Sequence, residues 1–369
     1  MARPTRLAFL VPSTLPHLFT TVRSFTLIKL ICLPSSTTPV FFLPSIRRCQ
    51  SESVSTMSSS AASPPPNEDQ PRAEMPTYMI YGTAWKKEST AELVYKAIKA
   101  GFRAIDTAHM KTHYNEPGTG EGVRRAVAEG LVKRSDLWIQ TKFTPGDAAF
   151  ADTKQYRTLA SQVHASVAES LRQLSTPDQD PAYIDCLILH QPMDSYNDSV
   201  EVWHAMMSHV HSGAVRTLGI SNARIRDLEE LEERFIGPPE IKIVQNRFIR
   251  ERTGGWDHKV RSWCLDHGAE YQGFWTLTGN RGVWERGFAT EEEPHLSVAA
   301  LADMAKISRA TAWYVLLSKM GVTVLNGTTS EKHMSDDLAG LSTVVASVPP
   351  DDLRRFTDAC SDLHVGIRR

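Results

Sequence analysis

The feature that most constrains the fold is an alternation of strand-like and helix-like segments that begins at residue 78. The predicted strands are residues 78–84, 102–107, 137–143, 183–190, 215–221, 241–247, 270–277 and 322–326. The fourth of them, YIDCLILH, is nearly all apolar, which is typical of a parallel strand buried on both faces. Because apolar residues at helical spacing follow the strands, the pattern predicts an α/β fold of the (β/α)8 TIM-barrel type.

A doubly wound open sheet is the alternative architecture. That fold places a Gly-rich phosphate-binding loop directly after its first strand. The corresponding stretch here, YGTAWK at residues 81–86, contains a single glycine. The run GTGEG at residues 118–122 does not directly follow a strand, and we interpret it as a turn and the start of a helix. These observations favour the barrel.

Composition and charge argue against several classes of protein. A charged fraction of 22%, a hydrophobic fraction of 41% and a net charge of −1 are ordinary for a globular protein and provide no basic field for nucleic acid. No apolar run of about 18 or more residues predicts a membrane-spanning helix. Five widely spaced cysteines without a C-x-x-C pair argue against a disulfide framework or a zinc site. We expect a cytoplasmic monomer without nucleic acid, membrane or metal as partner.

Residues 1–76 differ in composition from the rest and are predicted to be a disordered extension before a barrel domain at residues 77–369. Residues 1–51 hold six Arg or Lys and no acidic residue, a composition that resembles a mitochondrial transit peptide. Prolines within this stretch would interrupt the amphipathic helix of such a peptide. The alternative is that translation starts at Met57 and that residues 1–56 are not made. A working transit peptide would make the expected location mitochondrial.

Ionisable side chains gather at the carboxyl ends of the predicted strands. Asp106 lies near the end of the second strand, Lys142 near the end of the third and His190 at the end of the fourth, and Tyr114 follows in the loop after Asp106. Barrels of this type carry their active sites at that end. Each residue alone has an ordinary structural explanation, such as a helix cap, a solvated cation or a hydrogen-bonded histidine. Their convergence at one mouth instead predicts a chemical unit.

The four residue types together suit hydride transfer to an aldehyde or ketone. A tyrosine has a reference pKa of about 10, and a neighbouring lysine ammonium is expected to lower the pKa of Tyr114. Asp106 would keep Lys142 charged and oriented, and a neutral His190 can donate a hydrogen bond to a substrate carbonyl. Tyr114 would then act as the proton donor. Because no side chain supplies a hydride, the unit requires a cofactor.

Several short motifs follow one another in an informative order. They are IDTA at residues 105–108, YNE at 114–116, TK at 141–142, YIDCLILH at 183–190, VRTLGISN at 215–222 and VQN at 244–246. This set resembles the aldo-keto reductase superfamily over about residues 78–345. The resemblance implies a (β/α)8 barrel that binds NADPH in extended form, and an NADP-dependent oxidoreductase that reduces a small carbonyl compound to an alcohol. It implies Tyr114 as the general acid, Lys142 and Asp106 as its tuning partners, and His190 as the carbonyl-orienting residue.

The resemblance also implies a cofactor site and a substrate pocket. The cofactor-binding candidates are Gly82, Thr83, Asp106, Ser221, Asn222, Gln245, Phe274, Trp275, Leu277, Thr328, His333, Asp336 and Asp337. Among them, Ser221, Asn222 and Gln245 would hold the nicotinamide carboxamide. Phe274 would stack on the nicotinamide ring, or Trp275 if the match shifts by one residue. The substrate-pocket candidates are Trp85, Phe143, His190 and Phe248. Their aromatic side chains suit a medium-sized aldehyde or ketone better than a small sugar.

The sequence departs from the family pattern between Asp106 and Tyr114. These residues are eight positions apart, about three more than in most of the family, and a subset of fungal-type members shares the longer spacing. We expect the segment HMKTH at residues 109–113 to bulge outward while the loop still delivers Tyr114 to the site. The alternative is that His109 or His113 takes over part of the catalytic work.

A second departure concerns the choice of cofactor. NADPH-preferring members carry a basic residue after the last strand, and an arginine further on, to hold the 2′-phosphate. Gly327 and His333 occupy the matching positions, so Thr328, Thr329, Lys332 and His333 remain as phosphate contacts. Asp336 and Asp337 match positions that usually bind the adenine side. NADPH is the expected cofactor, and NADH is the alternative because the charge pairing is weaker.

Two other functions are compatible with a barrel of this kind. One is a sensory or regulatory NADPH-binding subunit with little turnover. The other is an aldolase or isomerase in which Lys142 forms a Schiff base, which Asp106 and the lack of a Gly-rich phosphate site disfavour. The substrate depends on the loops at the mouth, and in the loop at residues 279–295 either Trp284 or Arg286 could lie over the pocket.

Overall fold

The computed structural model describes residues 78–146, 156–234, 241–249, 256–285 and 297–359. The predicted N-terminal extension, with its transit peptide, lies outside these ranges. So do Arg286 and the rest of the expected mouth loop beyond residue 285. Within the described ranges, no helix has the length and apolar character needed to cross a membrane.

Eight parallel strands form a closed barrel in which each strand pairs with the next in sequence and the last pairs with the first. The strands are β1 Met79–Gly82, β2 Ala104–Asp106, β3 Trp138–Phe143, β4 Ile184–Leu189, β5 Val215–Ser221, β6 Ile241–Arg247, β7 Glu270–Phe274 and β8 Val322–Asn326. This arrangement confirms the predicted (β/α)8 barrel and excludes the open sheet.

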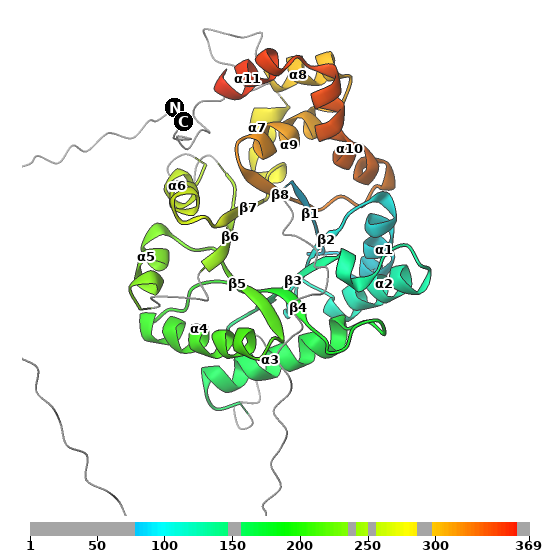
Figure 1. The fold of residues 1–369 in the computed structure, drawn as a ribbon. Coiled ribbons are helices and arrows are strands. Elements are labelled where there is room, and N and C mark those ends of the chain that lie inside the picture. The colour runs from blue at the N-terminus through cyan, green and yellow to red at the C-terminus, as the bar shows by residue number, and fades with distance from the viewer. Residues whose placement is uncertain (1–77, 147–155, 235–240, 250–255, 286–296, 360–369) are drawn as a thin grey trace, which may run out of the picture. The chain divides into compact units, whose positions relative to one another are not determined.

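Helices surround the ring of strands (Figure 1). They are α1 Thr90–Ala100, α2 Glu116–Ala128, α3 Leu159–Leu174, α4 Tyr196–His211, α5 Ile225–Arg234, α6 His258–His267, α7 Arg281–Trp284, α8 Val298–Ala305, α9 Arg309–Lys319, α10 Glu331–Ser347 and α11 Pro350–Ala359, with short 3-10 helices η1 Lys87–Ser89, η2 Arg134–Asp136 and η4 Thr278–Asn280. The run GTGEG lies inside α2, so it is helix from its first residue and no phosphate loop.

The helices pack apolar faces onto the outside of the barrel. In α1, for example, Leu93, Val94 and Ile98 are buried at helical spacing, and the helix ends at Gly101, whose φ of 117° favours a residue without a Cβ. All six residues of β3 and all six of β4 are buried, because one face meets the helices and the other meets the barrel interior.

The inner face of the barrel changes from apolar to polar toward the carboxyl ends of the strands. An apolar cluster contains Ile80, Ala104, Trp138, Cys186, Ile188 and Ile243. Residues two positions further along point to the same side, which places Asp106, Gln140 and Gln245 directly above this cluster. The indole N–H of Trp138 donates to Oε1 of Gln140 at 3.1 Å and so links the two layers.

The first, second, third, fourth and seventh strands are shorter than predicted, and the seventh has a clear local cause. The expected strand at residues 270–277 ends at Phe274, because Trp275 adopts a left-handed φ of 60°. The chain then turns, and the amide of Gly279 donates to the carbonyl of Trp275 at 2.8 Å. In the loop expected to follow, α7 forms, and the indole of Trp284 donates to the carbonyl of Leu277 at 2.9 Å.

Candidate active site

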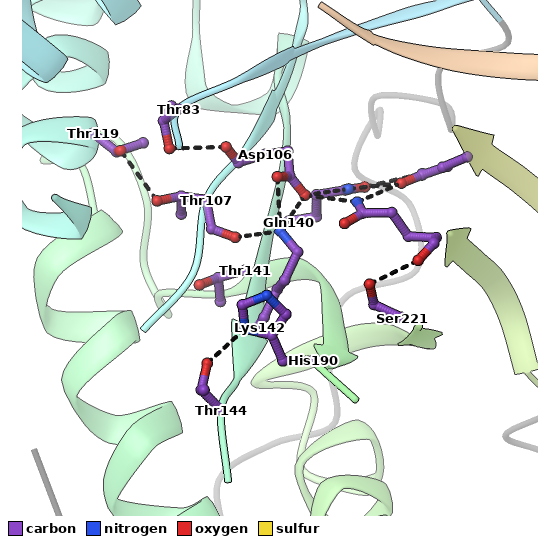
Figure 2. A network of polar contacts seen from close by, with 12 residues as sticks. Thr83, Asp106, Thr107, Thr119, Gln140, Thr141, Lys142, Thr144, His190 and Ser221 are labelled. Atoms are coloured by element: carbon purple, nitrogen blue, oxygen red, sulfur yellow. Dashed lines mark hydrogen bonds and ion pairs between the residues drawn. The ribbon is translucent and has the colours of Figure 1, made fainter. Parts of the chain in front are cut away.

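A buried ion pair between Asp106 and Lys142 lies at the carboxyl ends of β2 and β3 (Figure 2). The ammonium nitrogen of Lys142 is 2.6 and 2.7 Å from the two carboxylate oxygens and 2.8 Å from the carbonyl of Thr107. Both side chains are 1% exposed. Burial lowers the pKa of Lys142, and the charge of Asp106 opposes that shift. Three acceptors match the three ammonium protons, so the lysine has one fixed direction.

Two glutamines hold the carboxylate of Asp106 from the other side, and a third links them. The amide nitrogens of Gln140 and Gln245 donate to Oδ1 at 2.7 and 2.9 Å. Both also donate to Oε1 of Gln272, at 2.8 and 3.1 Å. Sequence reasoning identified Gln245 but missed Gln140 and Gln272. The signal was available, because a glutamine at an alternate position of a buried strand needs a polar partner inside the barrel.

Tyr114 lies beside this ion pair. Its ring centroid is 5.2 Å from the ammonium nitrogen of Lys142 and 6.0 Å from the ring centroid of His190, and the two rings are inclined by 70°. Burial, with a smaller effect from Asp106, raises the pKa of Tyr114 above its ordinary value. The expected lowering by Lys142 is therefore wrong, because burial disfavours the phenolate and the negative charge of Asp106 adds to that effect. The four residues predicted to be catalytic therefore lie together, and the raised pKa keeps the phenol of Tyr114 protonated.

His190 follows β4 and is held at three points. Its backbone amide donates to the carbonyl of Phe143 at 2.9 Å, and its own carbonyl accepts from the side-chain amide of Asn222 at 2.9 Å. Its Nδ1 lies 2.7 Å from the hydroxyl oxygen of Thr144. Burial, followed by the charges of Lys142 and His113, lowers the pKa of His190 to about 3. The imidazole is therefore neutral near pH 7, as the sequence predicted.

The first part of the lengthened loop runs inward, which corrects the predicted outward bulge. His109 is 5% exposed, and its amide donates to the carbonyl of Lys142 at 3.1 Å. Its Nδ1 is 3.1 Å from Oε2 of Glu116, which is itself 3% exposed. Glu116 also accepts from the hydroxyls of Ser170 and Thr141. The buried contact with Glu116 therefore anchors the first part of the loop through the imidazole of His109.

Only the middle of the loop bulges outward, at Lys111 and Thr112, which are exposed. The amide of Tyr114 donates back to the carbonyl of Met110 at 2.9 Å and closes a turn. His113 is half-buried, and its carbonyl accepts from the backbone amide of Trp85 at 2.7 Å. The turn takes up the extra residues and returns Tyr114 to the site.

A cavity of about 530 Å³ opens beside the ion pair, between the carboxyl ends of β1, β7 and β8. Asp106 forms part of its floor, and the exposed indoles of Trp85 and Trp275 lie on its wall. The predicted site residues that line it are Gly82, Trp85, Asp106, Phe274, Trp275, Leu277, Thr328, His333 and Asp337. Most of the candidates at or after the ends of the first, seventh and eighth strands therefore line a single cavity.

Other predicted residues lie elsewhere. Phe143 and Phe248 are 0% exposed and belong to the hydrophobic core, so their assignment to an open pocket is wrong. Thr83 is equally buried, and its hydroxyl donates to the backbone carbonyl of Asp106 at 3.0 Å. Asp336 is on the outer side of α10, where it pairs with Lys332.

The candidates at the ends of β5 and β6 lie close to the residues predicted to be catalytic, and their side chains are hydrogen-bonded to other groups of the protein. The hydroxyl of Ser221 donates to the carbonyl of Gln245 at 2.7 Å. The side-chain amide of Asn222 donates to Ser221 at 3.2 Å as well as to His190. Asp337 lines the cavity, but its carboxylate already accepts from Thr311 at 2.7 Å and Asn326 at 2.8 Å. A structural role accounts for these contacts of Asp337.

Lys86 is a cavity residue that sequence reasoning missed. It lines the wall, and its ammonium donates to the carbonyl of Gly327 across the cavity. A Cβ built on Gly327 would lie 3.8 Å from that nitrogen. Lys86 thus brings a positive charge to the position where the family's basic residue is absent. Lys86 is the last residue of the stretch YGTAWK, which follows the first strand, so its position in the sequence could have identified it.

The profile of the Aldo/keto reductase family matches residues 77–269, just over half of the chain. Among curated proteins, the NAD(P)H-dependent D-xylose reductase of Pachysolen tannophilus is 30% identical over 194 residues, which cover 45% of this chain and 55% of that protein. The methylglyoxal reductase DkgA of Salmonella typhimurium is 25% identical over 206 residues, which cover 55% of this chain and 64% of that protein. The matched part of the chain thus spans between half and two thirds of the length of these relatives.

Solved structures show the same fold at low sequence identity. An aldo/keto reductase from Brucella melitensis matches with a TM-score of 0.57 and 21% identity, over 77% of this chain and 95% of that one. The aldo-keto reductase AKR2E5 of Bombyx mori, solved with NADPH, matches with a TM-score of 0.57 and 19% identity, over 79% and 85%. Barrel, strand-end motifs and family profile agree, and the chain belongs to the aldo/keto reductase family.

Proposed function

We propose that this protein is an NAD(P)H-dependent oxidoreductase that reduces an aldehyde or ketone to an alcohol, with Tyr114 as the proton donor. One observation carries the proposal. The buried pair of Asp106 and Lys142 lies beside the protonated phenol of Tyr114 and the neutral imidazole of His190, and Asp106 also lines a cavity of about 530 Å³. This combination suits the addition of a proton to a carbonyl oxygen that gains negative charge.

Each side chain has a distinct part in that chemistry. A bound nicotinamide cofactor supplies the hydride. Tyr114, whose pKa is raised, holds a proton for the carbonyl oxygen. The ammonium of Lys142, 5.2 Å from the ring, stabilises the phenolate that remains after transfer. His190 is neutral and donates a hydrogen bond that orients the carbonyl.

The cavity walls fit a cofactor that combines an aromatic ring with phosphate groups. Phe274 and Trp275 present aromatic side chains, and Lys86 is the one lysine or arginine among the described residues that line the cavity. The exposed indoles of Trp85 and Trp275 suit a substrate of medium size with apolar character. We favour NADPH because Lys86 can pair with its additional phosphate in place of the missing basic side chain at Gly327.

The test uses the full chain with NADPH or NADH and a panel of aromatic and aliphatic aldehydes and ketones. Reduced cofactor should be consumed, and Tyr114→Phe should lower kcat by about 10²-fold or more. Tyr95→Phe is the matched control, because it removes a phenol hydroxyl on α1 outside the site. Turnover that survives in Tyr114→Phe would refute the assigned proton donor. Tight NADPH binding without turnover of any carbonyl would instead favour the regulatory-subunit alternative.

A further inference from the structure

Thr144 makes a specific contact with the imidazole of His190. It lies one residue beyond the end of β3, and its side chain points to the imidazole (Figure 2). The hydroxyl oxygen is 2.7 Å from Nδ1 of His190. The residue is 7% exposed, so its hydroxyl has little access to solvent. Within the part of the chain that the structure describes, this is the one hydrogen bond of the Thr144 side chain.

The number of protons decides the direction of this bond. A neutral imidazole carries one N–H, and the hydroxyl carries one O–H. If Nδ1 donated, the buried hydroxyl proton of Thr144 would have no acceptor among the described residues, and an unsatisfied buried donor is unfavourable. If the hydroxyl donates, both groups are satisfied and the imidazole proton must be on Nε2. That nitrogen makes no hydrogen bond to the described residues, so its N–H is available to a ligand.

We propose that Thr144 is a positioning residue that holds His190 in the Nε2–H tautomer and thereby makes it a hydrogen-bond donor to the substrate carbonyl. The inference rests on the proposed carbonyl reduction for its catalytic meaning, but the tautomer itself is independent of turnover. Without the hydroxyl, the Nδ1–H form becomes populated. In that form Nε2 is an acceptor, and it repels the carbonyl oxygen instead of binding it.

The first experiment reads the tautomer directly. The full chain is labelled with 15N-histidine, and the ring nitrogens are observed by long-range 1H–15N correlation near pH 7. The chain has 13 histidines, and the His190 signals are assigned by their loss in His190→Asn. We expect Nδ1 of His190 to show the shift of an unprotonated nitrogen and Nε2 that of a protonated one. In Thr144→Val, which keeps the shape but loses the hydroxyl, both shifts should move toward a mixture of tautomers.

The second experiment measures kinetics in matched variants. Thr144→Val should lower kcat/KM by about tenfold, the value for one hydrogen bond of ordinary strength, while the Kd for NADPH is unchanged. Thr144→Ser keeps the hydroxyl and should restore both the rate and the 15N shifts. If Val disturbs the fold, Thr144→Ala replaces it as the variant without a hydroxyl.

Two results would overturn the assignment: a protonated Nδ1 in the wild-type protein, or unchanged shifts and rates in both variants that lack the hydroxyl. Failure of the proposed function looks different. A protein that reduces no carbonyl would still show the tautomer and its loss in Thr144→Val. A protein that stays active as Tyr114→Phe would disprove the proton donor and leave the Thr144–His190 contact standing.

Discussion

The imidazole of His113 stacks on the indole of Trp85, with ring centroids 4.0 Å apart and planes inclined by 39°. The contact joins the lengthened loop after β2 to the loop after β1. Trp85 is 63% exposed, lines the cavity and has a left-handed φ of 63°, an uncommon conformation for a large side chain. The extra loop residues therefore buttress an aromatic side chain at the mouth of the site.

We predict that His113→Ala raises KM for aromatic aldehydes by about two- to tenfold, because an aromatic contact of this kind contributes roughly 0.5–1.5 kcal/mol. The value of kcat should change little, since Tyr114 remains in place. His113→Phe retains a ring against Trp85 and is the matched control. A fall of kcat by orders of magnitude in His113→Ala would mean that His113 supplies the proton.

Lys86→Met should weaken NADPH binding about 10- to 100-fold, the effect of losing one charged hydrogen bond, and should weaken NADH binding much less. Isothermal titration with each cofactor measures the ratio. Lys111→Met, an exposed change in the loop after β2, is the control for loss of a positive charge. Equal losses for both cofactors would show that Lys86 contacts a group that NADPH and NADH share.

The pH profile of reduction should be flat between about pH 5 and 9. Reduction requires Tyr114 protonated, and its raised pKa keeps the proton on the phenol as the pH rises toward its ordinary value. It also requires His190 neutral, and a pKa of about 3 keeps the imidazole neutral as the pH falls through its ordinary value. The measurement is kcat/KM against pH, with circular dichroism to confirm folding. A loss centred near pH 6.5 that vanishes in His190→Gln would contradict this assignment.

The buried ion pair should show strong coupling in stability. Asp106→Asn and Lys142→Met should each lower the free energy of unfolding by about 3–5 kcal/mol, because each leaves a buried partner without its counter-charge. The double variant should lose less than the sum of the two single losses. Urea unfolding of the four proteins measures the cycle. Additive losses would indicate that the two charges stabilise the fold independently.

Much of the fold follows from periodicity in the sequence. The predicted bounds of β5, β6 and β8 agree with the structure, because apolar runs between clear turn signals leave little freedom. The end of β7 was predicted three residues too late, because the sequence FWTL contains no residue that favours a left-handed backbone at Trp275. The indole of Trp275 meets the guanidinium of Arg247, whose central carbon lies 4.2 Å from the ring centroid, and such a tertiary contact is not encoded in the neighbouring residues.

The candidate catalytic group could be predicted from strand ends and from the loop after the second strand, but its surroundings could not. Whether a loop residue faces inward depends on partners distant in sequence, as His109 shows through its contact with Glu116 and, behind it, Ser170 on α3. The same limit explains Phe143 and Phe248, whose aromatic character is equally compatible with a pocket or a core. It also explains Lys86, whose relation to Gly327 spans 241 positions in sequence.

The glutamines that hold Asp106 lie on barrel strands, whereas substrate selectivity is expected to depend on the loops. Gln140, Gln245 and Gln272 belong to strands, so the barrel itself fixes the geometry of the pair of Asp106 and Lys142. Among the described residues, the side-chain hydrogen bonds to the carboxylate of Asp106 come from β3 and β6. On the proposed function, grafts into the loop after β6 are expected to change which carbonyl compounds are reduced while Asp106, Lys142, Tyr114 and His190 stay in place, which makes the scaffold attractive for directed evolution.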